Sequence, residues 1–288
     1  MKKIFLLFIA SFALMYSCSK DKDIDNPNKG EITIEADESF KSVAEALVER
    51  YTALNAKTKI NLVIKKEDLG LLDLLDKKAR VIVMSRELST KEKEAYDKKI
   101  DLPWKPAKFA ADAVLFVVPK DSPLETISME EIYTELNSDK KRLIFDGVNS
   151  SNLNFIAQKF NRTPSQLKFS IINGNENVAE QLKNYPDKIG VISYNTISRP
   201  FGVEAEKLRN ELKVLKVVKN NKAYTVSTDT LKDMSYPFTR VLYFITNEAY
   251  YGLGNGFIRF SCQQLGQIIV EKEGLQPYNI FKREVQMR

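Results

Sequence analysis

The 288 residues of this chain include no histidine, which limits the chemistry that its side chains can do. Ser-His and Cys-His nucleophile pairs and the usual zinc sites all need imidazole, so the sequence excludes them and predicts no metal site. A hydrolase built on two facing carboxylates stays open in principle, but no motif supports it. We therefore expect a protein that is not an enzyme, has no catalytic residues and carries no cofactor.

The N-terminus has the layout of a secretory signal peptide. Lys2 and Lys3 precede an apolar run at 4–16, and Ser17 stands directly before Cys18. The run is shorter than the ~20 apolar residues of a spanning helix. A cysteine in this place resembles the bacterial lipobox, whose cysteine is acylated and becomes the first residue of the mature chain. Residues 1–17 are thus predicted to be a signal peptide and Cys18 a lipid attachment site. An ordinary cleaved signal, in which Cys18 has no role, is the alternative.

Residues 18–30 are polar and charged and have no apolar period, which predicts a flexible, lipid-anchored tether. The chain would then lie in the cell envelope, anchored in a bacterial membrane and facing the periplasm or the outside. Its 44 basic and 38 acidic side chains form no basic stripe, so we expect no nucleic-acid partner. With Cys18 acylated, Cys262 has no disulfide partner and is expected to be a small buried residue.

Strand and helix patterns alternate along the rest of the chain. Residues 31–35 alternate apolar and polar side chains, as in a strand, whereas apolar residues in 40–55 repeat at helical spacing. Ser89 and Glu92 form a capping-box pattern. Further strands are expected at 59–65, 79–85, 111–120, 141–147, 188–194, 213–219 and 241–246, and further helices at 69–77, 89–99, 128–136, 150–160 and 256–274. This order predicts an α/β fold with doubly wound sheets flanked by helices.

Several segments, in the same order along the chain, resemble the phosphate-binding branch of the periplasmic solute-binding proteins. They are MSREL (84–88), ADAV (111–114), the segments 118–133, 173–194 and 236–246, and GQIIVEKEGLQP (266–277). The resemblance implies a two-lobed type II periplasmic-binding-protein fold with two crossover strands as a hinge. Residues 31–108 and 238–288 would form lobe 1, and residues 109–237 lobe 2. It also implies a monomer that captures a small oxyanion, phosphate first, for an ABC-type permease.

In that family, backbone amides and hydroxyls at helix N-termini hold the oxyanion. Orphan amides and the helix dipole both favour negative charge there. The resemblance places the ligand-binding residues at three loop-to-helix junctions, namely Ser39-Phe40, Ser85-Arg86 and Asn149-Ser150-Ser151. A bidentate contact from the arginine would add to the amides. In the simpler interpretation, Ser39 and Ser150 only cap helices and Arg86 pairs with a nearby acid such as Glu87.

Acidic residues depart from the family pattern near each junction. Asp37, Glu67, Asp68 and Asp146 stand where the family has glycine, serine or arginine, and their charge raises the cost of placing a phosphate dianion nearby. The alternative function is therefore the same fold with a degraded pocket, acting as an envelope interaction or sensor protein. Asp112, in the ADAV segment, is expected to have a structural role near the hinge.

Overall fold

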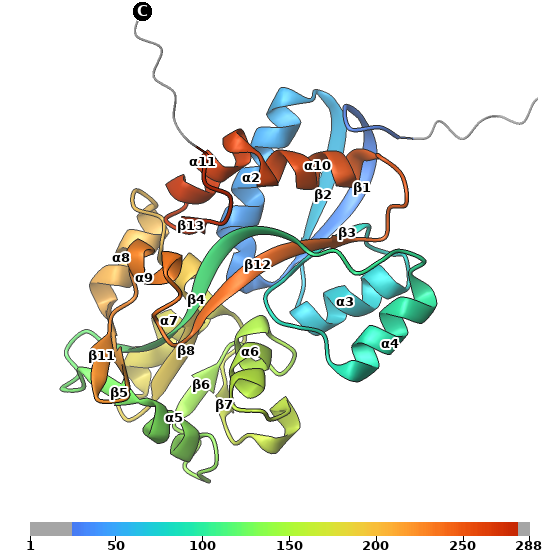
Figure 1. Cartoon of the computed structure of the whole chain (residues 1–288). Coiled ribbons are helices and arrows are strands. Elements are labelled where there is room, and N and C mark those ends of the chain that lie inside the picture. Colours follow the sequence, from blue (N-terminus) through green and yellow to red (C-terminus); the bar gives the residue numbers. More distant parts are fainter. Residues whose placement is uncertain (1–24, 282–288) are drawn as a thin grey trace, which may run out of the picture.

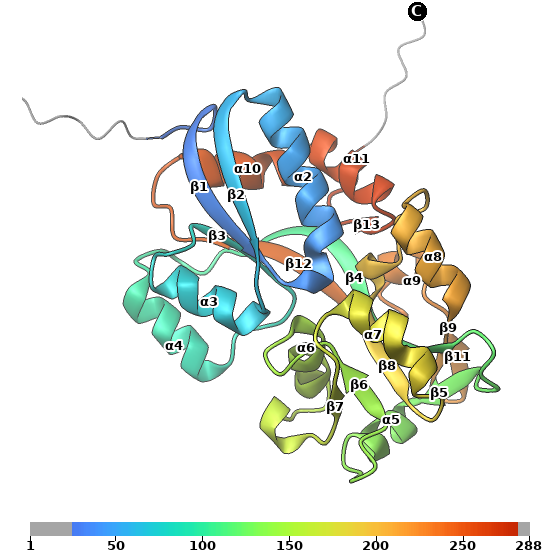
Figure 2. The ribbon, with the colours of Figure 1, turned by 180° about the vertical axis from the view of Figure 1, so that it is seen from behind.

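The computed structural model describes residues 25–281 and shows two lobes connected by long strands (Figure 1). Strands and helices alternate as expected, so the predicted two-lobed α/β fold is confirmed. Figure 2 shows the same two bodies from behind, with helices on the outside of both. The predicted signal peptide at 1–17 and Cys18 lie outside the described residues.

The first lobe is built on three parallel strands in the order β2-β1-β3. Its elements are β1 (Lys29–Ala36), β2 (Lys57–Ile64), β3 (Val81–Met84), the 3-10 turn η1 (Glu38–Phe40), α2 (Lys41–Leu54), α3 (Glu67–Leu75), α4 (Thr90–Lys99), α10 (Leu253–Cys262) and α11 (Gln264–Lys272). Ile32 and Ile34 of β1 are buried in one cluster with Val43 and Leu47 of α2, which explains both sequence periods. Ser89 and Glu92 form the expected capping box of α4.

The second lobe contains the middle of the chain. Its elements are β5 (Thr126–Ser128), β6 (Leu143–Phe145), β7 (Ser170–Ile171), β8 (Ile189–Ser193), β9 (Leu212–Val214), β10 (Lys216–Lys219), β11 (Lys222–Tyr224), α5 (Met129–Glu135), α6 (Ser151–Lys159), α7 (Asn175–Gln181), α8 (Val203–Glu211), α9 (Thr228–Lys232) and three 3-10 turns, η2 (Pro164–Gln166), η3 (Leu182–Asn184) and η4 (Tyr194–Thr196). The prediction of a single strand at 213–219 is wrong. The chain there changes sheets at Leu215, because β9 pairs with β4 whereas β10 pairs with β5 and β11.

Two strands connect the lobes. One half of β4 (Ala107–Pro119) pairs with β12 (Thr239–Thr246) and β13 (Gln276–Pro277), and its other half pairs with β8 and β9. The buried apolar residues form separate clusters that divide at β4. One cluster consists of residues between Ala111 and Phe238, and the buried residues of the other two clusters come from the sequence before and after that stretch. The lobe limits at 108–109 and 237–238 stay a prediction.

The folded part of the chain begins earlier than the expected end of the tether at residue 30. The Asp25 carboxylate pairs with Arg80 at 2.9 Å and accepts the Leu253 amide, and the Pro27 carbonyl accepts the Tyr51 hydroxyl. Residues 25–30 therefore pack on the first lobe. Cys262 is half-buried, and burial raises the pKa of its thiol to about 11, as befits an unreactive residue. Within residues 25–281, no helix is long and apolar enough to cross a membrane.

Candidate functional site

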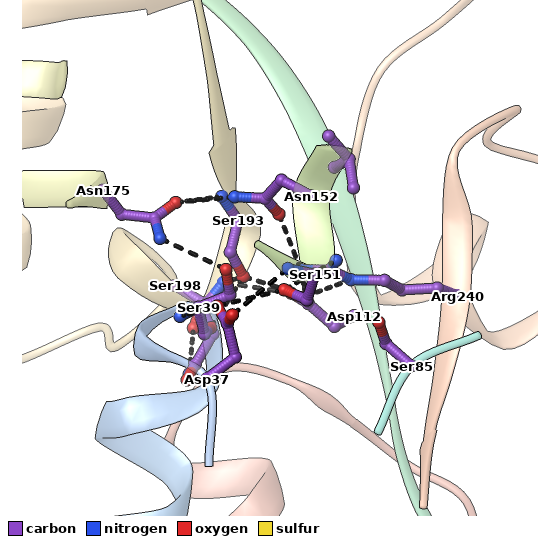
Figure 3. Close-up of polar contacts among 12 residues, drawn as sticks. Asp37, Ser39, Ser85, Asp112, Ser151, Asn152, Asn175, Ser193, Ser198 and Arg240 are labelled. Carbon is purple, nitrogen blue, oxygen red and sulfur yellow. Dashed lines mark hydrogen bonds and ion pairs between the residues drawn. The ribbon is translucent and has the colours of Figure 1, made fainter. Parts of the chain in front are cut away.

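The carboxylate of Asp37 lies among polar side chains that come from both lobes (Figure 3). Asp37 follows β1 and is only 1 % exposed. Its Oδ1 accepts the Ser39 amide at 3.0 Å and the Ser151 hydroxyl at 3.1 Å. Its Oδ2 accepts the Glu67 amide at 3.0 Å and the Ser151 amide at 3.1 Å. Four donors thus converge on two carboxylate oxygens.

These donors form what we call the amide cradle, which consists of the amides of Ser39, Glu67 and Ser151 and the Ser151 hydroxyl. Ser39 belongs to the turn that leads into α2, and Glu67 and Ser151 are the first residues of α3 and α6. Amides at these positions have no partner inside their own helix. The N-termini of α3 and α6 and the turn before α2 aim their amides at one point, which favours a negative charge there. The cradle is therefore an anion-binding arrangement.

Arg240 of β12 adds a full positive charge beside the cradle. Its side chain is fully buried and forms an ion pair with Asp112, with Nη2 at 2.8 Å from Oδ2. Nη1 donates to the Ser151 hydroxyl at 3.4 Å and Nη2 to Asn152 Oδ1 at 3.0 Å, and the guanidinium lies 4.8 Å from the centre of the Phe40 ring. Asp112 thus has the structural role expected of it, since it fixes this arginine.

Sequence analysis missed Arg240. The resembled family carries an arginine before its Ser-Gly-Thr triplet, and this chain lacks that arginine, since Phe145 and Asp146 stand in the region. The structure supplies a guanidinium from the hinge strand. A signal was present in the sequence, because Arg240 is the single charged residue of the segment 236–246 and directly precedes the strand predicted at 241–246.

Buried amides and hydroxyls extend the cradle into a polar network. Asn175 donates to Ser39 Oγ and to Asp146 Oδ2, both at 3.1 Å. Asn152 donates to Asp146 Oδ1 at 3.2 Å and to the Asn175 side-chain oxygen at 2.8 Å. The Ser193 amide donates to that same oxygen at 2.9 Å. Because the members satisfy one another, the network fixes the positions of the cradle donors.

The second predicted junction faces a carboxylate of the chain itself. Ser85 donates through its amide at 2.8 Å and through its hydroxyl at 2.9 Å to Glu67 Oε1. Glu67 supplies its own amide to the cradle, so Ser85 lies one residue behind the cradle.

Arg86 is surrounded by three acids. Its guanidinium pairs with Glu67 at 3.1 Å and with Asp68 and Glu92 at 2.7 Å each. The simpler interpretation suggested Glu87 as the acidic partner. Of Glu87, however, Arg86 contacts the backbone carbonyl and not the side chain. A direct role of Arg86 in ligand binding stays a prediction, and its three acidic partners favour the ion-pair interpretation.

The other predicted residues lie around the cradle and donate no hydrogen bond to the Asp37 carboxylate. Phe40 donates its amide to the Asp37 backbone carbonyl, and its ring packs against Arg240. Ser150 caps α6, as the simpler interpretation suggested, by accepting the Leu153 amide. The carbonyl of half-buried Asn149 accepts the Asp68 amide at 3.4 Å. Among the predicted residues, Ser39 and Ser151 therefore meet directly at the cradle.

Acids crowd the site, and their ionisation responds to it. Burial raises the pKa of Glu67, and the negative charge of Asp37 raises it further. The positive charge of Arg86 lowers this pKa but does not cancel the effect of burial. Burial and the Asp37 charge likewise raise the pKa of Asp146, although Lys66 lies 3.3 Å from its Oδ2. Burial is also the first cause of the raised pKa of Glu38. The site thus contains several acidic side chains that the binding of an anion does not require.

A pocket of about 290 Å³ opens between the lobes next to this network. Its walls come from η1 and α2 on one side and from α7, η4 and α8 on the other. The lining residues are Glu38, Lys41, Ser42, Glu45, Asn175, Glu176, Asn195, Thr196, Arg199, Gly202, Val203, Glu204 and Ala205. Because Asn175 also contacts Ser39, the pocket lies one side chain away from the cradle.

Two lobes with a β4–β12 hinge and a buried anion-binding centre between them define a type II periplasmic-binding-protein fold. The chain belongs to the PBP superfamily, whose domain model matches residues 21–264.

One curated protein and several solved structures are similar over most of the chain. The phosphate-binding protein PstS of Borreliella burgdorferi is 25% identical over 294 residues, which cover 95% of this chain and 97% of that protein. A Clostridium perfringens protein whose crystal structure holds bound phosphate superposes with a TM-score of 0.70 at 18% identity, covering 87% of this chain and 100% of that one. An ABC-type phosphate transport receptor from Vibrio cholerae gives a TM-score of 0.63 at 15% identity over 86% and 100% of the two chains. These structural likenesses concern the fold.

Proposed function

We propose that this protein captures a small oxyanion, phosphate first, between its lobes and delivers it to an ABC-type transporter. The family supports this proposal, because the similar proteins described above carry phosphate binding or phosphate transport in their names. They are substrate-binding proteins, so we propose no enzymatic activity. We expect it to act as a monomer.

The amide cradle is the single observation that carries the proposal. Its amides and hydroxyl hold two oxygens of a carboxylate at 3.0–3.1 Å, which is the geometry that two oxygens of a phosphate require. A tetrahedral anion has two further oxygens, and buried Arg240 lies beside Ser151 to meet one of them. We propose that Ser39 and Ser151 bind the anion directly and that Phe40, Ser85, Asn149 and Ser150 hold the backbone around it.

Isothermal titration calorimetry tests this function. The purified protein is unfolded and refolded to remove any carried-over ligand and is then titrated with phosphate, sulfate, molybdate and acetate. We expect phosphate to bind with a dissociation constant of about 1 μM or below, and acetate not to bind. A folded protein that gives no heat with any of the four would contradict the proposal. It would support the alternative of an envelope interaction or sensor protein.

We also propose that Cys18 carries a lipid and holds the chain in the bacterial envelope. Cys18→Ala is expected to move the protein from the membrane pellet to the soluble fraction, because the chain would lose its acyl attachment. Cell fractionation and immunoblotting measure the shift, and Cys262→Ala is the matched control. An unchanged membrane fraction in Cys18→Ala would show that another feature retains the protein.

A further inference from the structure

The carboxylate of Asp37 does more than cap a helix. An N-cap side chain typically accepts an amide two or three residues ahead, and the bond from Ser39 fulfils that role. The other three bonds come from Glu67, 30 positions away, and from Ser151, 114 positions away. Most of the interaction of Asp37 is therefore with distant parts of the chain.

These distant partners belong to different lobes. Glu67 begins α3 in the first lobe, whereas Ser151 begins α6 in the second. The Asp37 carboxylate therefore joins the two lobes through charge-assisted hydrogen bonds. Lys66 reinforces the contact by donating to the Asp146 carbonyl at 2.7 Å across the same boundary. The lobes are held together here by groups of the chain itself.

A phosphate and this carboxylate require the same donors. Each cradle amide supplies one hydrogen, and all three amides point at Asp37. A dianion placed beside an ionised Asp37 would be repelled by it, and buried Glu67 and Asp146 would add to the repulsion when ionised. The two anions therefore exclude one another from the cradle.

We propose that Asp37 is an internal ligand of the amide cradle, which closes the lobes without solute and which phosphate must displace in order to bind. This inference rests on the proposed function and deepens it. The state with Asp37 in the cradle is not competent to bind, so the apparent affinity for phosphate is reduced by the fraction of molecules in the competent state.

Displacement also selects among anions. A tethered carboxylate has a high effective concentration at the cradle, and a free monocarboxylate offers the same two oxygens with no further contact. Phosphate has four oxygens and a second charge, and it can also reach Arg240 beside Ser151. Asp37 is therefore a specificity-determining residue that excludes small carboxylates and admits tetrahedral oxyanions.

Asp37→Ala tests the internal ligand, with Glu31→Ala as its matched control. The control removes the same charge from the other end of β1, where the carboxylate is exposed, lies 2.7 Å from Lys59 and is outside the cradle and the pocket. Small-angle X-ray scattering measures the radius of gyration with and without phosphate, and calorimetry measures affinity. We expect the parent and Glu31→Ala to be compact in both states. Asp37→Ala should be expanded when free, contract with phosphate and bind it about tenfold more tightly or better.

Acetate provides a readout that does not depend on phosphate. It should fill the vacated position in Asp37→Ala, contract the free protein and raise its melting temperature, while leaving the parent unchanged. If Asp37→Ala does not fold, Asp37→Asn keeps one acceptor oxygen and should show the same expansion in weaker form. A free Asp37→Ala protein as compact as the parent, or one that binds phosphate no more tightly than a parent that does bind it, would overturn the inference. Expansion and acetate rescue without phosphate binding by either protein would support the internal ligand and overturn the proposed transport function.

Discussion

Arg240→Met is expected to lower the free energy of unfolding by about 3–5 kcal/mol, because it leaves the Asp112 carboxylate buried without a counter-ion. Both side chains of the pair are fully buried, so water cannot take the place of the guanidinium. Urea unfolding at pH 7.5 measures the loss by linear extrapolation.

The same substitution should weaken phosphate binding by roughly 10- to 100-fold, since a hydrogen bond to a charged group contributes about 1.5–3 kcal/mol. The double variant Asp112→Asn/Arg240→Met separates the two effects. Its asparagine oxygen can still accept the Asn195 amide that Asp112 accepts at 3.0 Å, and neither charge of the Asp112–Arg240 pair is left buried. We expect it to recover most of the stability but not the affinity. Recovery of both would show that Arg240 acts on phosphate only through the fold.

Arg86→Met is expected to lower the free energy of unfolding by about 3–5 kcal/mol near pH 7, and the size of this loss should depend on pH. The substitution leaves fully buried Glu67 facing no cation, since no other cation contacts it in the described part of the chain. Burial already raises the pKa of Glu67 in the parent, so the ionised form opposes folding above its ordinary value of 4.5. Removing the guanidinium increases that penalty at neutral pH, and protonation removes it as the pH falls.

Glu92 contributes in the same direction. Burial opposes ionisation of Glu92, yet hydrogen bonds and charge from Arg86 lower its pKa to about 2. The resulting stabilisation is present above pH 4.5, is lost as pH falls toward 2, and is missing in Arg86→Met. The difference in unfolding free energy between parent and variant should therefore be largest near pH 7 and shrink below about pH 5. Urea unfolding at several pH values measures it, with the exposed arginine variant Arg162→Met as control. A difference independent of pH would mean that Glu67 and Glu92 do not carry it.

The elements with a strong local pattern could be predicted from the sequence. β1 alternates along its length, α4 begins with a capping box, and β3 and β8 are continuous apolar runs. The helix α8 was missed because charged residues dominate it, and only Ala205 and Leu208 are buried. Its position depends on tertiary contacts rather than on a clear amphipathic period.

The candidate site could be predicted only in part, for a physical reason. Ser39 and Ser151 were predicted because the resemblance implies ligand-binding residues at these loop-to-helix junctions. Asp37 was recognised as an acid that opposes an anion, but the sequence does not say where its carboxylate points. Its partners Glu67 and Ser151 are distant in sequence, as are the acids around Arg86. Long-range pairing of this kind follows from the packing of the lobes and has no signature in the neighbouring residues.

The division of the cores along β4 has a consequence for how the chain matures. The apolar core of the second lobe uses one uninterrupted stretch, from Ala111 to Phe238, whereas the first lobe needs residues from both ends of the chain. A chain that emerges from its N-terminus at synthesis or export can complete the second lobe while the first still lacks β12, α10 and α11. Until those elements arrive, the edge of β3 that pairs with β12 has no partner. Between the emergence of Phe238 and that of α11, this unpaired edge and the incomplete apolar core of the first lobe are exposed together, which is the condition that favours aggregation.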